Sequence, residues 1–130
     1  MRVFFDTSFF VAGIDARDQW HEMAERAAVP GLEGVASAPV IDETLTLLQR
    51  RGMFSAALSF LRGIRHDPDV RIIYPDAALQ AEAWNLFARW GASGVTVVDC
   101  MSFAIMRSMG IHKAFTFDEH FRAAGFETLR

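Results

Sequence analysis

Short apolar runs that end in a carboxylate stand near both ends of the chain. Residues 3–5, Val-Phe-Phe, favour a β-strand and lead directly into Asp6, a pattern typical of a buried parallel strand. Residues 113–117, Lys-Ala-Phe-Thr-Phe, lead in the same way into Asp118. Further strands are predicted at residues 34–37, 70–74 and 126–129.

Between these strands, apolar side chains recur at the spacing of one face of an α-helix. Glycine or proline follows several of these segments and marks their ends. The predicted helices cover residues 8–14, 20–29, 39–51, 54–66, 77–90, 96–109 and 119–124. Strands that alternate with helices predict a three-layer α/β/α sandwich with a central, mostly parallel sheet.

The chain has 130 residues, of which 52% are hydrophobic, and this predicts one domain with a substantial core. Its net charge of −3 provides no general attraction to nucleic acid. The single cysteine, Cys100, excludes an intrachain disulfide and a cysteine-based zinc site. Because we find neither a secretory signal nor an apolar run of about 20 residues, we expect a soluble cytoplasmic protein without membrane contact.

Certain acidic residues fall where α/β proteins place their functional sites. Asp6 and Asp118 follow strands, and the carboxyl ends of parallel strands meet at one edge of the sheet. Asp99 and Glu43 lie in the first turns of two predicted helices. The strand ends could therefore bring Asp6 and Asp118 to one cleft, and Asp99 and Glu43 are the further candidates for it.

Structural roles could also explain the same positions. Asp6 could cap the helix that follows it, although either of the next two hydroxyl residues could do so equally well. Asp99 could serve only to satisfy the positive end of its helix. Glu43 could face solvent, and its neighbour Asp42 is a rival candidate for the cleft.

Carboxylates gathered in one cleft repel one another, and a bound cation removes that repulsion. Mg²⁺ and Mn²⁺ prefer oxygen ligands, and such an ion can activate water for attack on a phosphodiester. The histidines show no spacing typical of metal ligands, which argues against zinc. His120 lies two residues after Asp118 and could contact a substrate, but a surface histidine is the simpler interpretation.

The order of these motifs resembles the PIN domain, and most closely the ribonuclease toxins of bacterial VapBC toxin–antitoxin pairs. The similar segments are Phe-Asp-Thr-Ser at 5–8, Asp-Glu-Thr-Leu-Thr-Leu-Leu at 42–48, Thr-Val-Val-Asp-Cys-Met-Ser-Phe-Ala at 96–104 and Thr-Phe-Asp-Glu-His-Phe at 116–121. The resemblance covers essentially the whole chain, so residues 1–130 are expected to form a single PIN domain.

The resemblance implies a set of catalytic acids that bind the metal: Asp6, Glu43, Asp99 and Asp118. It also implies small hydroxyl residues that support this site: Thr7, Ser8, Ser102 and Thr116. Ser102 lies one helical turn after Asp99 and is expected to orient that carboxylate. Glu119 is expected to face solvent.

The same resemblance implies a Mg²⁺- or Mn²⁺-dependent endoribonuclease that acts on RNA and is inhibited by a small antitoxin. A homodimer is also implied, and the helices at 39–51 and 54–66 are expected to help form the dimer and an antitoxin groove. The alternatives are an RNA-processing PIN nuclease and a non-catalytic RNA- or partner-binding module. A phosphatase of the haloacid dehalogenase type is disfavoured, because Ser8 stands where that family needs a second aspartate.

Overall fold

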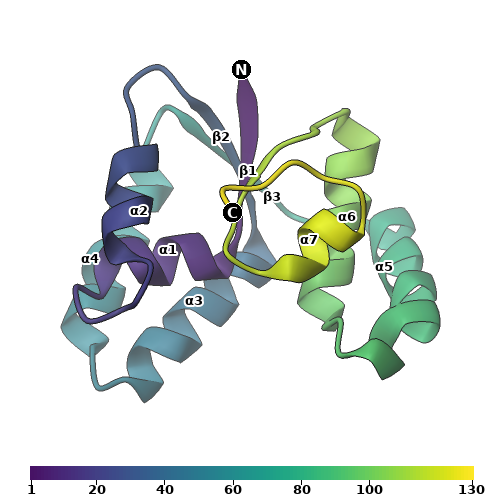
Figure 1. The fold of residues 1–130 in the computed structure, drawn as a ribbon, viewed down its shortest axis with the longest axis horizontal. Coiled ribbons are helices and arrows are strands. Elements are labelled where there is room, and N and C mark those ends of the chain that lie inside the picture. The colour runs from purple at the N-terminus through teal and green to yellow at the C-terminus, as the bar shows by residue number, and fades with distance from the viewer.

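The computed structural model describes residues 1–130 as a parallel four-stranded sheet with helices on both sides (Figure 1). The strands are β1 (Arg2–Phe5), β2 (Glu33–Ser37), β3 (Val70–Ile73) and β4 (Ala114–Phe115). Their order in the sheet is β3-β2-β1-β4, so β1 is central and pairs with β2 on one side and β4 on the other. The predicted α/β architecture with a central parallel sheet is confirmed.

The helices cover the sheet in two groups, which Figure 1 shows on either side of β1. Four precede the edge strand β3 in the chain: α1 (Thr7–Ile14), α2 (His21–Ala27), α3 (Ala38–Arg50) and α4 (Phe54–His66). The other three follow it: α5 (Ala77–Trp90), α6 (Val97–Met109) and α7 (Glu119–Ala123). No helix combines the length and the apolar character that crossing a bilayer requires.

The side chains of β1 contribute to two cores, because successive residues of a strand point to opposite faces of the sheet. Val3 packs in one core with Phe9 of α1 and Phe115 of β4. Phe4 is buried in the other core with residues of α6 such as Phe103. β1 is therefore held from both sides, and the residue that follows it is placed firmly.

Gly34 of β2 allows the ring of Phe5 to lie against the neighbouring strand. A Cβ atom at position 34 would collide with that ring, so this close approach requires glycine. The Phe5 ring stacks on Phe9, with 5.3 Å between the ring centroids. This packing fixes the last residue of β1, immediately before Asp6.

Several predicted elements differ from the structure. The strand predicted at 113–117 covers only Ala114–Phe115, so Asp118 does not follow it directly. The strand predicted at 126–129 is wrong, since only an isolated bridge joins Glu127 to Lys113. The chain does not continue along β4, because Thr128 bonds locally to the carbonyl of Arg130. The helix predicted from residue 20 begins at His21, because Asp18 Oδ1 accepts a hydrogen bond from the Trp20 backbone nitrogen and holds a turn there.

Candidate active site

A cleft of about 270 Å³ lies at the carboxyl ends of β1 and β4, beside the N-terminal turns of α1, α3 and α6. Open parallel sheets place their functional sites at this edge. The lining includes all the acids predicted for the site: Asp6, Glu43, Asp99 and Asp118. Trp20, Phe117 and Arg51 are among the other lining residues.

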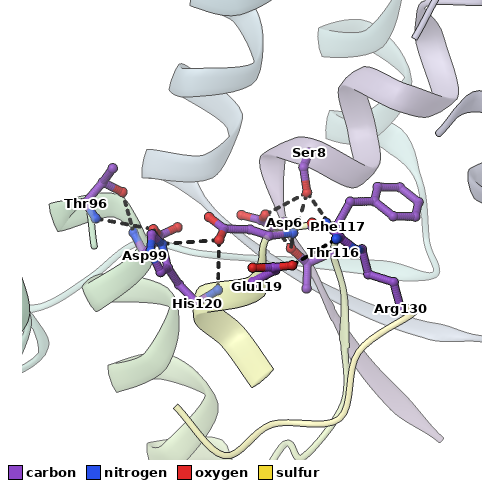
Figure 2. A network of polar contacts seen from close by, with 10 residues as sticks. Asp6, Ser8, Thr96, Asp99, Thr116, Phe117, Glu119, His120 and Arg130 are labelled. Atoms are coloured by element: carbon purple, nitrogen blue, oxygen red, sulfur yellow. Dashed lines mark hydrogen bonds and ion pairs between the residues drawn. The ribbon is translucent and has the colours of Figure 1, made fainter. Parts of the chain in front are cut away.

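Asp6 is held by hydroxyl groups instead of capping a helix. It stands at the N-terminus of α1 with only 3% of its surface exposed, and its side chain makes no capping hydrogen bond. Its Oδ2 accepts hydrogen bonds from Ser8 Oγ at 2.9 Å and from Thr116 Oγ1 at 2.7 Å (Figure 2). The alternative in which Asp6 only caps α1 is therefore wrong. The other carboxylate oxygen, Oδ1, accepts no hydrogen bond from Ser8 or Thr116.

Ser8 and Thr116 also join the ends of β1 and β4. Ser8 Oγ accepts a hydrogen bond from the Phe117 backbone nitrogen at 2.9 Å, and Thr116 Oγ1 accepts one from the Asp118 backbone nitrogen at 3.0 Å. Each hydroxyl has one hydrogen, and both hydrogens go to Asp6. The 3.2 Å contact between the two hydroxyl oxygens therefore adds no further bond. The network fixes Asp6 relative to the backbone at Asp118.

Thr7 and Ser102, the other hydroxyl residues expected to support the site, bond elsewhere. Thr7 Oγ1 donates to the Val40 carbonyl at 3.4 Å and links α1 to α3, although Thr7 still lines the cleft. Ser102 Oγ donates to the Val98 carbonyl at 3.1 Å within α6. The expectation that Ser102 orients Asp99 is wrong, because a serine inside a helix readily bonds to the carbonyl four residues earlier.

Asp99 caps its own helix and also lines the cleft. Thr96 Oγ1 accepts a hydrogen bond from the Asp99 backbone nitrogen at 3.1 Å, and Asp99 Oδ2 accepts one from the Thr96 backbone nitrogen at 3.3 Å. This reciprocal pair is a capping box. One oxygen of Asp99 thus caps the helix, as the structural alternative expected. The residue is also 95% buried and lines the cleft beside the other acids.

His120 lies beside two of the acids, where the sequence pattern predicts a surface histidine. Asp118 Oδ1 accepts a hydrogen bond from the His120 backbone nitrogen at 2.9 Å and caps α7. The ring places Nδ1 3.2 Å from Asp118 Oδ1 and 3.6 Å from Asp99 Oδ2 (Figure 2). One potential ligand atom from each of these three residues lies within 4.8 Å of the other two. The only feature of the sequence that indicated a position for His120 near the acids is its spacing of two residues from Asp118.

Glu43 extends the acidic lining from α3. It is half-buried and makes no side-chain hydrogen bond or ion pair, so its carboxylate is free to bind a ligand. Its neighbour Asp42 is exposed and does not line the cleft. Glu119 is also exposed and pairs with Arg130 at 3.0 Å, outside the acidic group.

Comparisons with known proteins identify the family. The PIN domain family model matches residues 3–127. The chain belongs to the PIN domain family. It is 39% identical over 130 residues to the 23S rRNA-specific endonuclease VapC20 of Mycobacterium tuberculosis, in strains CDC 1551 and H37Rv, with 98% of each chain covered. The resemblance noted from the sequence motifs is confirmed.

Solved structures of PIN proteins agree with this assignment. The crystal structure of Mycobacterium tuberculosis VapC20, described as a Sarcin-Ricin loop cleaving toxin, has a TM-score of 0.87 to this chain at 40% identity. The match covers 95% of both chains. FitAcB from Neisseria gonorrhoeae has a TM-score of 0.65 at 16% identity and covers 100% of this chain and 97% of its own. At that identity FitAcB shows a shared fold only.

Burial and mutual repulsion raise the pKa values of two acids in the PIN cleft. Burial raises the pKa of Asp6 to about 6, although the hydrogen bonds from Thr116 and Ser8 act in the opposite direction. Burial, followed by the charges of Asp6 and Asp118, raises the pKa of Asp99 to about 7. Ionising these acids together is therefore unfavourable without a neighbouring positive charge.

The donor chemistry of the PIN cleft suits a hard divalent cation, and the ligand atoms that lie within 4.8 Å of one another are those of Asp99, Asp118 and His120, while Asp6 and Glu43 line the same cleft. The lining supplies carboxylate oxygens from four separate parts of the chain: Asp6 between β1 and α1, Glu43 on α3, Asp99 on α6 and Asp118 just before α7. Mg²⁺ and Mn²⁺ both prefer carboxylate oxygen and water. The raised pKa values of Asp6 and Asp99 show that this cleft would gain from a bound positive charge.

An ion-pair cluster at the rim of the PIN cleft was not predicted from the sequence. Arg51 Nη1 lies 2.9 Å from Asp15 Oδ2 and 3.2 Å from Asp18 Oδ2. Hydrogen bonds from the Arg17 backbone and the Arg51 side chain lower the pKa of buried Asp15 to about 2. The cluster ties the connection between α1 and α2 to the end of α3. It was hidden in the sequence because Asp15 and Arg51 are 36 residues apart.

Proposed function

We propose that the protein is a metal-dependent endoribonuclease, the toxin of a type II toxin–antitoxin pair, acting in the cytoplasm with residues 1–130 as one PIN domain. The observation that carries the proposal is the meeting of four acids in one cleft at the strand ends: Asp6, Glu43, Asp99 and Asp118. The 39% identity to an endonuclease across 98% of both chains supports hydrolysis of RNA phosphodiester bonds.

These four acids would hold a Mg²⁺ or Mn²⁺ ion. Such an ion lowers the pKa of water and stabilises the leaving oxygen of a phosphodiester when it is bound. The protein contributes the positions of the ligands. Ser8 and Thr116 hold one oxygen of Asp6, and Thr96 holds one oxygen of Asp99, so both carboxylates are oriented before a ligand arrives.

The proposed substrate is 23S rRNA at the sarcin–ricin loop. The related VapC20 is described as cleaving that loop, and the similarity extends over nearly the full length of both chains. A cleft of about 270 Å³ has room for one phosphodiester and parts of the flanking nucleotides. RNA in a loop presents single nucleotides to such a cleft more readily than a paired helix does.

We also propose a small antitoxin partner and a homodimer. An apolar groove of about 380 Å³ lies between α1, α2 and α4, with Phe10, Phe60 and Ile64 among its lining residues, so of the two helices expected to form such a groove only α4 lines it. Such a groove suits the apolar face of a partner helix. Phe54, at the start of α4, is 59% exposed and is a candidate contact in the dimer. An antitoxin arginine could then pair with the cleft acids in place of the ion.

Cleavage of a sarcin–ricin loop RNA by the purified protein tests the proposal. We expect cleavage with Mn²⁺ or Mg²⁺, and a loss of at least about tenfold in Glu43→Gln, which removes one ligand. Asp42→Asn is the matched control, because Asp42 is adjacent but exposed and outside the cleft. Full activity of the Glu43→Gln variant would contradict the assignment of Glu43 as a metal ligand. Cleavage of an unrelated RNA but not of this loop would favour an RNA-processing enzyme.

A further inference from the structure

The ring of His120 has an unsatisfied nitrogen at the edge of the acidic group. Its Nδ1 atom is inaccessible to solvent and has no hydrogen-bond partner. Asp118 Oδ1 and Asp99 Oδ2 approach it to 3.2 Å and 3.6 Å, but not in hydrogen-bond geometry (Figure 2). A buried polar atom without a partner is costly and calls for an explanation.

A backbone hydrogen bond fixes the position of His120 relative to Asp118. The His120 backbone nitrogen donates to Asp118 Oδ1 at 2.9 Å, which ties the histidine to the acid that caps α7. Asp99 faces the same ring nitrogen from the first turn of α6. Two elements from different parts of the chain therefore present a nitrogen and carboxylate oxygens to one point, with their ligand atoms within 4.8 Å of one another.

We propose that His120 binds the divalent ion of the cleft through Nδ1, together with Asp99 and Asp118. The inference rests on the proposed metal-dependent function and adds a nitrogen ligand to its oxygen ligands. A bound ion satisfies the orphaned nitrogen and separates the two carboxylates at the same time. A simple ion pair between a protonated His120 and the acids is the alternative that the experiment must exclude.

A nitrogen ligand changes which ions the cleft prefers. Mg²⁺ binds oxygen almost exclusively, whereas imidazole raises the affinity for transition metals. Removing the ring should therefore weaken Mn²⁺ binding by about tenfold or more and change Mg²⁺ binding much less. If the histidine were only an ion-pair partner, its removal would affect both ions alike.

Electron spin echo measurements on the protein with one equivalent of Mn²⁺ test the inference directly. In the wild type we expect the nuclear modulation of a directly bound imidazole nitrogen. The modulation should disappear in His120→Ala and persist in His112→Ala, a control on an exposed histidine that does not belong to the group of Asp99, Asp118 and His120. Melting curves in EDTA verify that both variants fold.

The outcomes separate this inference from the proposed function. Bound Mn²⁺ without nitrogen modulation in the wild type would overturn the role of His120 and leave the metal-dependent ribonuclease intact. Equal loss of Mn²⁺ and Mg²⁺ affinity in His120→Ala would also overturn it. If Mn²⁺ does not bind and RNA is still cleaved in EDTA, both the inference and the metal-dependent function fail.

Discussion

Replacing Asp6 with asparagine separates metal binding from folding. Asp6 is 3% exposed, and its pKa is raised from 3.8 to about 6. Because the folded protein binds this proton more tightly than the unfolded chain, the stabilising contribution is complete below a pH of about 3.8 and is lost as the pH rises through about 6. Each pKa unit corresponds to about 1.4 kcal/mol, so ionised Asp6 costs the metal-free fold about 3 kcal/mol at alkaline pH.

Asp6→Asn removes this cost and preserves the shape of the side chain. Its amide oxygen still accepts from Ser8 and Thr116, as a neutral acid would, and the stronger bonds to the charged carboxylate are already contained in the raised pKa. The expectation for the metal-free variant near pH 8 is therefore a gain of up to about 3 kcal/mol, on the order of 10 °C in Tm. Near pH 5 the gain should be about half as large, and it should disappear below about pH 3.8, where Asp6 is protonated in both the folded and the unfolded chain.

Thermal melts of both proteins in EDTA and in excess Mn²⁺ provide the assay. Mn²⁺ should raise the Tm of the wild type and raise that of Asp6→Asn less, since a ligand that binds only the folded state stabilises it by mass action. Asp42→Asn controls for the loss of one negative charge at an exposed position. The reasoning is refuted if Asp6→Asn melts well below the wild type in EDTA yet gains as much from Mn²⁺.

Two further substitutions test the contacts around the cleft. Thr116→Val should weaken Mn²⁺ binding by about tenfold, because the Asp6 carboxylate loses its 2.7 Å hydrogen bond. Calorimetric titration measures the affinity, with Thr46→Val as the control at an exposed threonine. Equal Mn²⁺ affinities for Thr116→Val and the wild type would contradict this prediction. Arg51→Met should lower Tm at neutral pH, because it removes a partner of buried Asp15. Because the pKa of Asp15 is lowered in the folded protein, the ionised carboxylate stabilises the fold above a pH of about 3.8, and this stabilisation is lost as the pH falls to about 2. The Tm difference should therefore shrink in acid, and exposed Arg50→Met should show no such dependence.

Much of the fold follows from local patterns in the sequence. The apolar run before Asp6 becomes the central strand, because a parallel strand covered on both faces must be apolar throughout. Helical spacing correctly predicts α4 and α5 at residues 54–66 and 77–90. The strand ends then place Asp6 and Asp118 along the lining of one cleft.

Side-chain directions in the site could not be read from spacing alone. Ser102 is one turn from Asp99, yet its hydroxyl bonds to the carbonyl of Val98. His120 reaches Asp99 only because α7 packs beside the start of α6, and no local pattern specifies that packing. The choice of Glu43 over Asp42 came from the family resemblance, and the cleft contains Glu43.

The most direct test of the central claim is the rate of RNA cleavage in EDTA, before and after Mn²⁺ is restored, for the wild type and Asp6→Asn side by side. We predict no cleavage by wild type in EDTA, recovery when Mn²⁺ exceeds the chelator, and little recovery in Asp6→Asn, because this substitution weakens one metal ligand. Cleavage by contaminant-free wild type that continues unchanged in EDTA would contradict a metal-dependent mechanism. Full recovery in Asp6→Asn would contradict the assignment of the buried carboxylate at the end of β1 as a metal ligand.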